Sequence, residues 1–519
     1  MPKELFIKLT PEETAEEKFL LAKISSSLNI PKNTAFEYEV VKKSVDARSR
    51  KQVYWVYKVL VYINEAKPDK NFDTISYQKV KENKKAVIVG AGPAGLFAAL
   101  ELIKNGIKPI VLERGKDVRS RRRDLALINQ KQIVNPESNY CFGEGGAGTY
   151  SDGKLYTRST KRGDVNEVLQ TFIHFGASPE IGVLAHPHIG TNKLPQIIQN
   201  MRNTIIENGG EVRFETKVTD FLVEDNQLKG VFCEDEFIAC ENLILATGHS
   251  ARDIFELLER KKIQIEAKPF AMGVRIEHPQ TLIDEIQYHK KERGDYLPPA
   301  SYSLVEQVEG RGVYSFCMCP GGIIAPCATA PGEVVTNGWS PSKRNNPYAN
   351  SGMVVSIEPK DFEKYKHLGN LAGLAYQQEL EKKAWEAGGK TQVAPAQRVV
   401  DFVNRKISSD LPNCSYQPGI VSSNIYDVLP PEISLRLQKA LVKFGEKMRG
   451  YYTNEAVLVG VESRTSSPVK IPRDKETLMH TQVKGLYPCG EGAGYAGGIV
   501  SAAIDGIKCA RAIAENLTR

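Results

Sequence analysis

Residues 86–103 read Ala-Val-Ile-Val-Gly-Ala-Gly-Pro-Ala-Gly-Leu-Phe-Ala-Ala-Leu-Glu-Leu-Ile. The apolar run before the glycines predicts a short buried strand, and the run after them predicts a helix that ends at Asn105-Gly106. A second strand over residues 108–113 ends in Glu113, about 20 residues beyond the glycines. Strand, glycine turn, helix, strand and acid in this order are typical of a Rossmann dinucleotide-binding unit.

Each part of this unit has a physical role. Gly90 permits the tight turn, Gly92 lets the backbone approach a pyrophosphate, and Gly95 lets helix and strand pack closely. The helix N-terminus attracts phosphate, and Glu113 would accept hydrogen bonds from ribose hydroxyls. The cofactor contacts predicted in this unit are Gly90, Gly92, Pro93, Ala94, Gly95, Glu113 and Arg114.

Two later segments favour FAD over NAD. Residues 242–248, Asn-Leu-Ile-Leu-Ala-Thr-Gly, resemble the segment with which flavoproteins of the glutathione-reductase type return to their cofactor. Residues 485–494 end a strand in Gly490-Glu491, and the next helix would point its positive N-terminal end at the flavin ring. NAD alone would explain neither segment. The further predicted cofactor contacts are Val218, Ala246, Thr247, Gly248, Gly490, Glu491, Gly498 and Ile499.

Composition indicates a globular chain of several domains. The 519 residues include 69 Lys and Arg against 62 Asp and Glu, and 41% are hydrophobic. The net charge of +7 neither requires nor excludes an anionic partner. Nine cysteines without a CxxC motif suggest reduced thiols. With no apolar run of transmembrane length and no secretory signal, we expect a cytoplasmic protein.

The chain divides into three predicted domains. Residues 1–80 form an α+β appendage with the order β–α–β–β, joined through a polar stretch at 67–85. Residues 81–265 and 485–519 form the FAD-binding domain, in which the runs 211–224 and 228–240 suggest an antiparallel excursion. Residues 266–484 form an inserted substrate domain with a long helix over 368–387.

The appendage carries a basic hairpin over residues 42–58. Across this range six basic residues face only one acid, Asp46. They are Lys42, Lys43, Arg48, Arg50, Lys51 and Lys58. The pattern fits a solvated surface, or a docking patch for RNA or an acidic partner.

Several phrases together resemble a family of FAD-dependent proteins described as NAD(FAD)-utilising dehydrogenases. The resemblance covers residues 85–519 and lies in the segments 90–95, 142–154, 188–194, 337–344, 461–467 and 490–494. It implies an α/β fold with a glutathione-reductase-type FAD-binding Rossmann domain, an inserted mixed α+β substrate domain and a small N-terminal α+β domain. It names no substrate.

Two motifs of disulfide reductases are absent: a second GxGxxG and a cysteine pair spaced CxxC or CxxxxC. NAD(P)H, if used, would therefore bind without a second Rossmann unit. Residues 143–148 contain glycines but follow no apolar strand, so we expect a loop over the flavin or its phosphates. Its predicted contacts are Gly145, Gly146 and Gly148.

Four residues are candidates for catalysis. Lys154 could balance negative charge on the flavin or on an anionic substrate, or it could form a surface ion pair with Asp152. Glu462 and Arg464 share a face of a predicted strand, so Arg464 could bind a carboxylate that Glu462 helps to orient, or the two could form a structural ion pair. His249, just after Ala-Thr-Gly, is a candidate base.

Three other patterns are weaker. Cys317-Met-Cys319 invites a redox interpretation, but CxC spacing does not guarantee disulfide geometry, so we expect two buried, apolar-like side chains. His186 and His188 have no further ligands at metal spacing, so we predict no metal site. The basic run 119–123 could reach phosphates or form a solvated helix face.

We therefore expect an FAD-dependent oxidoreductase that passes a hydride between a small-molecule substrate, or NAD(P)H, and flavin N5. A flavin monooxygenase is one alternative. An RNA-associated flavoprotein that uses the basic hairpin is another, and among the partners we rank nucleic acid lowest. We expect no membrane partner.

Overall fold

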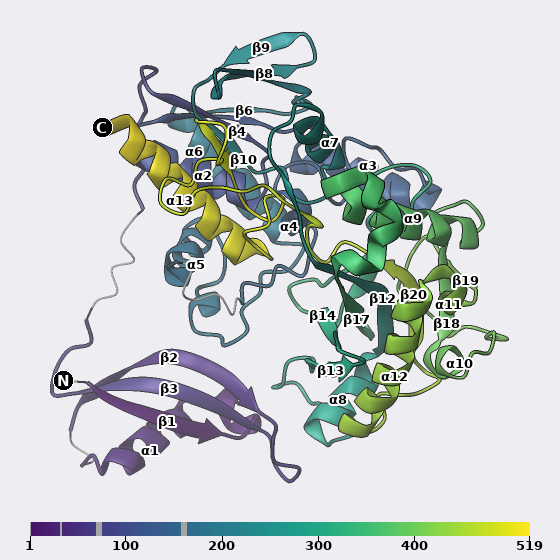
Figure 1. Ribbon diagram of the computed structural model, residues 1–519. Coiled ribbons are helices and arrows are strands. Elements are labelled where there is room, and N and C mark those ends of the chain that lie inside the picture. Colours follow the sequence, from purple (N-terminus) through teal and green to yellow (C-terminus); the bar gives the residue numbers. More distant parts are fainter. Residues whose placement is uncertain (1, 32–33, 69–74, 157–162, 519) are drawn as a thin grey trace.

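Three sheets and the helices packed on them make up most of the chain in this computed structural model (Figure 1). The structure describes residues 2–31, 34–68, 75–156 and 163–518. The polar stretch 67–85 falls partly outside these ranges. The N-terminal sheet, the five-stranded sheet and the seven-stranded sheet follow one another along the chain, and the C-terminal residues return to the five-stranded sheet.

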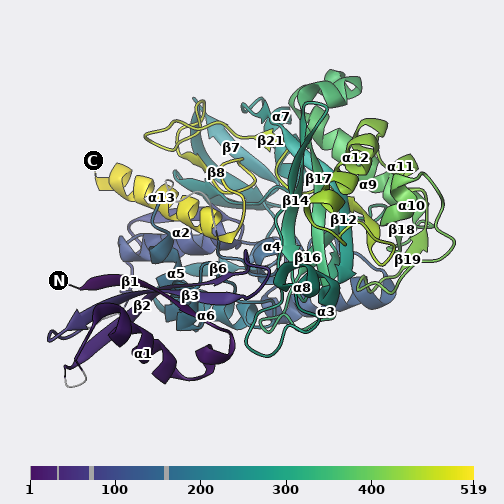
Figure 2. The ribbon, with the colours of Figure 1, turned by 90° about the horizontal axis from the view of Figure 1, so that it is seen from below.

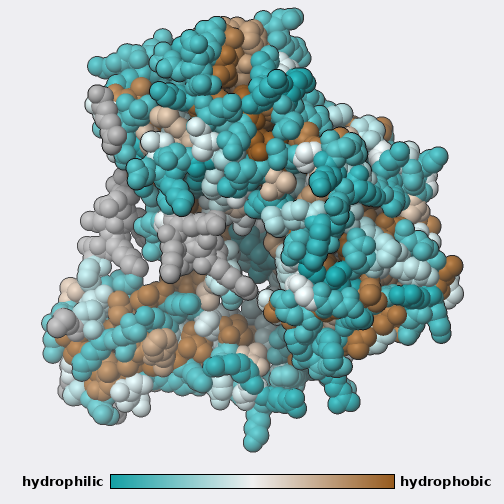
Figure 3. Space-filling view, viewed as in Figure 1, coloured by the Kyte–Doolittle hydropathy of each residue, from teal (hydrophilic) through white to brown (hydrophobic). Residues whose placement is uncertain are grey.

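The N-terminal sheet is antiparallel, in the order β1-β3-β2. Its elements are β1 (Lys3–Leu9), η1 (Glu12–Ala15), α1 (Glu17–Leu28), β2 (Phe36–Asp46) and β3 (Tyr54–Ile63), which is the predicted β–α–β–β order. Alternate residues of β3 are buried with Leu20 and Ile24 of α1 in one apolar cluster. In Figure 3 apolar residues gather on this part of the surface.

The basic hairpin engages the rest of the chain. The Lys43 N–H donates to the Val183 carbonyl at 2.7 Å, and its own carbonyl accepts from Ala185 N. The Lys43 ammonium lies 4.5 Å from the centroid of the Trp55 ring, whose Nε1 donates to the Tyr296 carbonyl. Part of the hairpin therefore contacts the two larger parts of the molecule.

The five-stranded sheet is parallel, in the order β22-β10-β4-β5-β6. Its strands are β4 (Lys85–Val89), β5 (Lys108–Leu112), β6 (Glu211–Arg213), β10 (Leu243–Leu245) and β22 (Leu486–Pro488). One face carries α2 (Pro93–Lys104), α5 (Val165–His174), α6 (Leu194–Glu207) and α13 (Ile499–Thr518), and Figure 2 shows α13 beside α2. Ala86 and Ile88 of β4 point to these helices, whereas Val87 and Val89 point to the other face.

The opposite face of this sheet carries an antiparallel excursion and α7 (Arg252–Arg260). The excursion consists of β7 (Asp220–Glu224), β8 (Gln227–Cys233) and β9 (Glu236–Ala239). The prediction for residues 211–224 was wrong in one respect. Residues 211–213 pair with β5 in the parallel sheet, and only the later residues belong to the excursion.

The seven-stranded sheet is mixed, in the order β13-β14-β17-β12-β20-β18-β19. Its strands are β12 (Phe270–Pro279), β13 (Val305–Val308), β14 (Arg311–Cys319), β17 (Tyr348–Ile357), β18 (Ala394–Arg398), β19 (Ile420–Ser422) and β20 (Val457–Glu462). Helices α8 (Gln280–Tyr288), α9 (Ala372–Ala387), α10 (Val399–Val403), α11 (Ile425–Val428) and α12 (Pro431–Lys447) pack around it. The boundaries of the three predicted domains stay a prediction.

The long helix expected over 368–387 is shorter than predicted. Helix α9 begins at Ala372, directly after the 3₁₀ segment η4 (Pro359–Leu371), in which Gly369 has a non-helical φ of 56°. The remaining elements are α3 (Val118–Lys131), α4 (Gly146–Thr149), η3 (Pro179–Gly182), β11 (Glu266–Ala267), β15 (Ile323–Pro326), β16 (Thr336–Trp339) and β21 (Val469–Lys470). Among the described residues, no helix combines the length and the apolar character that crossing a membrane requires.

Candidate functional site

The turn between β4 and α2 has an open space at its centre. A Cβ atom at Gly90 would lie 2.5 Å from the Ala246 carbonyl oxygen, and one at Gly95 would collide with the Gly90 carbonyl. Glycine is therefore required at these two positions by the close approach of neighbouring backbone. A Cβ at Gly92, in contrast, would meet Gly146 Cα only at 3.9 Å. Gly92 is also the N-cap of α2, and no side chain caps this helix end. The residues therefore fit a pyrophosphate, which would take the free space and the uncapped helix end.

Glu113 joins three segments around this turn. Its Oε2 accepts a hydrogen bond from Ala91 N at 2.8 Å, and its Oε1 accepts from Gly115 N and Gly143 N, each at 2.9 Å. The side chain is only 5% exposed. A carboxylate has about four acceptor positions, so one on Oε2 is left for a ribose hydroxyl. Glu113 thus supports the loop geometry besides the ribose contact predicted for it.

The glycine loop lies against the same turn, on the side of α4. Gly145 N donates to the Ala91 carbonyl at 2.8 Å, and a Cβ at Gly146 would lie 3.1 Å from Gly92 Cα. A Cβ at Gly148 would lie 3.2 Å from Pro93 Cγ and 3.3 Å from Ile499 Cγ1. The fold therefore brings the predicted contacts of this loop to the turn and to the first residue of α13.

The basic run 119–123 divides between two environments. Arg121 is fully buried and donates to the carbonyls of Asn139, Glu144 and Gly146 at 2.8 to 2.9 Å. It holds the glycine loop in place, a role that the sequence did not suggest. Arg119 and Arg122 line a cavity of about 510 Å³ together with Val118, Tyr140, Tyr150, Thr191, Asn192, Pro195, Gln196, Gln199 and Trp339.

The segment after β10 closes another side of the site. Ala246 N donates to the Val89 carbonyl at 2.9 Å, and a Cβ at Gly492 would lie 2.5 Å from the Gly248 carbonyl oxygen. Residues 246–248 therefore lie between the first turn and residues 490–494. Two other predicted contacts lie further along the ends of this sheet. Val218 is buried beneath β4 and β5, and Arg114 pairs with Asp253 at 2.6 Å.

Glu491 lies between His249 and the start of α13. His249 Nδ1 is 3.2 Å from Glu491 Oε2, and the N–H of Gly498 donates to Oε1. Burial alone would raise the pKa of Glu491, but its contacts with His249 and Gly498 hold that pKa below its ordinary value. A Cβ at Gly497 or Gly498 would meet nothing within 4 Å. This helix start therefore has room for a flavin ring, and the contact with the ring stays a prediction.

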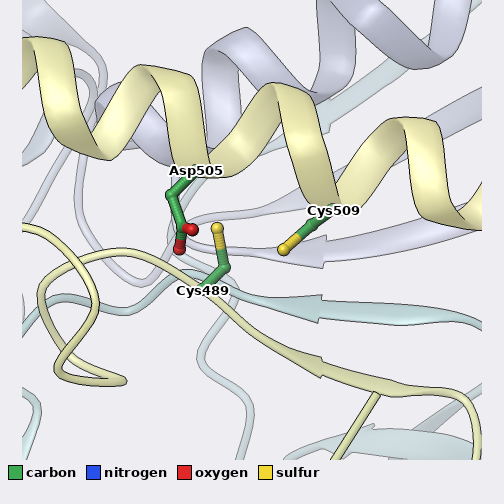
Figure 4. A group of neighbouring side chains, drawn as sticks. All are labelled: Cys489, Asp505 and Cys509. Carbon is green, nitrogen blue, oxygen red and sulfur yellow. The ribbon is translucent and has the colours of Figure 1, made fainter. Parts of the chain in front are cut away.

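A compact cluster fastens α13 behind the site (Figure 4). The ligand atoms of Cys489, Asp505 and Cys509 lie within 4.8 Å of one another. The Arg473 guanidinium donates to both oxygens of Asp505, at 2.6 and 3.0 Å, and Gly490 N donates to the same carboxylate at 2.8 Å. Because Arg473 already supplies the positive charge, we interpret the cluster as an anchor between β22 and α13.

Glu462 and Arg464 do not pair with each other. Glu462 ends β20 and meets Arg275 of β12, with Nη1 and Oε2 at 3.1 Å. Arg464 lies beyond the end of the strand, so the alternation that would place both side chains on one face no longer applies. It donates to Glu381 at 2.9 Å and to Glu333 at 2.8 Å. The predicted pair is therefore wrong, and the charge of Arg464 is compensated by two carboxylates.

Lys154 contacts β14 instead of Asp152. Its Nζ donates to the Met318 carbonyl, whereas Asp152 is 1% exposed and pairs with Arg344 at 2.5 Å. His188 lies opposite Lys154 in an isolated bridge, and its Nε2 is 3.0 Å from the Ser342 carbonyl. Burial and the nearby charge of Arg344 lower the pKa of His188 to about 4. The alternative of a surface ion pair between Asp152 and Lys154 is thereby excluded.

Sequence reasoning missed Arg275 and Arg344. Arg275 is 0% exposed and also donates to Asn350 at 2.9 Å and to the Cys317 carbonyl at 2.7 Å. A charged residue inside the apolar run of residues 270–276 was a signal that could have identified it. Arg344 had no comparable local signal, because its partner Asp152 lies far away in the sequence.

Comparisons with known proteins agree with an FAD site. Residues 83–131 match the family "FAD binding domain", residues 269–465 match "FAD-dependent protein, C-terminal domain-like", and residues 1–62 match a domain of unknown function, DUF8436. An uncharacterized protein of Clostridium beijerinckii is 40% identical over 514 residues, 95% of each chain.

Solved structures are more distant. A geranylgeranyl bacteriochlorophyll reductase-like protein of Thermoplasma acidophilum is 12% identical, with a TM-score of 0.34 over 84% of this chain and 79% of that one. CtdE in complex with FAD is 11% identical, with a TM-score of 0.30 over 85% and 89%. TM-scores this low support no argument about function, so the family assignment rests on the sequence matches. The chain belongs to the same family as the clostridial protein, and it is an FAD-dependent oxidoreductase.

Proposed function

We propose that this protein is a dehydrogenase that passes a hydride between flavin N5 and a small-molecule substrate or NAD(P)H. The observation that carries the proposal is the open space at Gly92 and at Gly498, which lie at the starts of two helices from opposite ends of the chain. Gly148 lies beside both helix starts, and Gly145 and Gly146 lie beside the turn before α2. When bound there, FAD supplies a carrier of two electrons.

The chain's own residues would bind and orient the cofactor. The N-terminus of α2 and Gly92 would receive the pyrophosphate, and the free acceptor position of Glu113 would receive a ribose hydroxyl. The N-terminus of α13 would stabilise negative charge that develops on the ring. His249, held by Glu491, stays the candidate for proton transfer on this side.

Positive charge on the proposed substrate side comes from Lys154. Its Nζ donates to the Met318 carbonyl, whereas Arg344 is paired with Asp152 and Arg275 with Glu462. An anionic substrate is favoured by such a setting, since a charge held in place costs no reorganisation when the substrate binds. Arg464 is not part of this proposal, because Glu381 and Glu333 compensate its charge.

The test is an anaerobic absorbance spectrum of the purified full chain, before and after addition of NADH or NADPH. We expect flavin bands, and bleaching by a pyridine nucleotide would identify the donor. Persistent bands would direct the search to substrates that reduce the flavin. If reduced protein then consumes oxygen and yields a hydroxylated product, the function is that of a monooxygenase instead. A protein that holds no FAD even after reconstitution contradicts the proposal.

A further inference from the structure

Strand β14 is irregular where it carries Cys317 and Cys319. Its pairing with β17 shifts register between Phe316 and Cys319, which marks a bulge, and Cys317 has a φ of 50°. In a regular strand, residues two apart have Cα atoms about 6.6 to 6.8 Å apart. That separation is at the outer limit for a disulfide. At the bulge the strand departs from this regular spacing, on which the expectation of two inert side chains rested.

The Cys319 thiol contacts the backbone of Cys317 in this turn. Cys319 Sγ lies 3.3 Å from the Cys317 carbonyl oxygen, which also accepts from Arg275 Nη2 at 2.7 Å. Arg275 Nη2 is in turn 3.5 Å from Cys319 Sγ. A buried guanidinium therefore fixes the backbone of the bulge and touches the second sulfur.

The surroundings make the two sulfurs unequal. A hydrogen bond from Cys319 outweighs the effect of burial and holds the pKa of Cys317 below its ordinary value, with help from the charges of Lys154 and Arg275. Two carboxylates oppose this effect, but Asp152 is paired with Arg344 and Glu462 with Arg275. The same hydrogen bond, together with burial, raises the pKa of the Cys319 thiol.

The two cysteines also differ in their exposure to solvent. Cys317 is half-buried, whereas Cys319 is 0% exposed. A partly exposed thiolate beside a buried thiol is the arrangement that thiol–disulfide exchange requires, because the thiolate attacks and the thiol resolves the mixed disulfide. The seven other cysteines of the chain are Cys141, Cys233, Cys240, Cys327, Cys414, Cys489 and Cys509.

We propose that Cys317 and Cys319 form a redox-active pair and that the substrate of this site is a disulfide or the corresponding thiols. The Cys317 thiolate attacks one sulfur of the substrate disulfide and releases one thiolate, which takes up a proton. Cys319 then loses its proton, and its Sγ attacks Cys317 Sγ, so that a disulfide forms between the two cysteines and the second substrate thiolate leaves and takes up a proton. In total the pair, which starts as a thiolate and a thiol, loses two electrons and one proton, and the substrate gains two electrons and two protons, one of them from water.

The pair returns to the dithiol form when it receives two electrons and two protons. Reduced flavin is the donor in the reaction proposed above, so this return step alone depends on the proposed function. Exchange between the cysteine pair and a small disulfide needs no flavin, so it can be tested independently of the proposed function.

The test uses the full chain in anaerobic buffers of reduced and oxidised glutathione. After acid quenching, free thiols are labelled with a maleimide under denaturing conditions and the protein is digested with trypsin. Residues 312–343 contain no Lys or Arg before Lys343, so they form one peptide with Cys317, Cys319 and Cys327. We expect three labels on this peptide in reducing buffer and one label, on Cys327, in oxidising buffer.

Variants separate the roles of the two sulfurs. In Cys319→Ser the mixed disulfide cannot be resolved, so one glutathione stays on Cys317. In Cys317→Ser the peptide gains no glutathione, since the buried Cys319 is a poor nucleophile. The matched control Cys233→Ser, a buried cysteine of β8, behaves like the wild type. Three labels on the wild-type peptide in every buffer would overturn the proposal, and this readout needs no variant.

A second measurement tests the nucleophile. The rate of alkylation of Cys317 by iodoacetamide follows its thiolate, so its pH midpoint lies below the value of about 8.5 of an ordinary thiol. Lys154→Met moves the midpoint upward. A midpoint at or above the ordinary value contradicts the assignment. If the pair oxidises reversibly but the flavin is never reduced, the pair stands and the proposed dehydrogenase function fails.

Discussion

Arg275 Nη1 lies 3.1 Å from Glu462 Oε2 in the interior of the seven-stranded sheet, where both side chains are at most 3% exposed. The pair joins the neighbouring strands β12 and β20. Arg275 also reaches the Cys317 carbonyl in β14, two strands from β12 in the sheet. One buried cation thus connects the centre of the sheet to the bulge that carries the two cysteines.

Gly92→Val should abolish retention of FAD and leave the fold intact. Gly92 has an ordinary φ of −76°, and its Cβ would meet Gly146 Cα only at 3.9 Å, so a side chain there enters the space assigned to the pyrophosphate. We expect a colourless protein with the thermal midpoint of the wild-type apoprotein. Gly95→Val should instead fail to fold, because its Cβ collides with the Gly90 carbonyl. A yellow Gly92→Val protein would disprove the assignment of this turn.

Arg464→Met should lower stability without a specific effect on substrate binding. Arg464 shares Glu333 and Glu381 with Arg252 in a buried network. Removing one partner of such a network costs about 3 to 5 kcal/mol, which urea denaturation measures. Lys383→Met removes an exposed pair with Glu379 and should cost about 0 to 1 kcal/mol. A raised KM with unchanged stability would instead make Arg464 a substrate contact.

His188→Gln should reduce the acid sensitivity of the protein. The pKa of His188 is about 4 in the fold and 6.5 ordinarily, so between these values the unfolded chain binds a proton that the folded chain does not. The contribution of His188 is fully present above pH 6.5 and is lost as the pH falls toward 4. Denaturant midpoints at pH 7 and pH 4.5 should differ less in His188→Gln than in the wild type. The exposed His367→Gln is the control, and an equal effect in both variants would contradict the prediction.

Arg473→Met should loosen the C-terminal helix. Its guanidinium compensates Asp505 beside Cys489 and Cys509, so its loss leaves a buried carboxylate unpaired. We expect a loss of about 3 to 5 kcal/mol and faster amide exchange in α13. We also expect zinc not to stabilise the wild-type protein, since Arg473 already binds the carboxylate. A zinc-dependent rise in the thermal midpoint would make the cluster a metal site.

The local sequence pattern was sufficient to predict the nucleotide-binding half of the molecule. The apolar run 86–89, the glycines after it and Glu113 predict strand, turn, helix and acid, because each depends on neighbours within a few residues. The same holds for residues 242–248 and 485–494, whose strands β10 and β22 complete the parallel sheet. The uninterrupted apolar run of β4 is likewise typical of a strand that is buried on both faces.

The partners of charged and sulfur groups depend on packing between segments far apart in the chain. Arg464 turns to Glu381 because β20 ends at Glu462, and spacing alone cannot show where a strand ends. Cys317 and Cys319 meet because β14 bulges against β17, which pairing between strands determines. Sequence therefore determined the cofactor and the class of enzyme, since these rest on short-range backbone geometry. The partners of the charged groups and thiols proposed to face the substrate were determined by long-range packing, which no local pattern encodes.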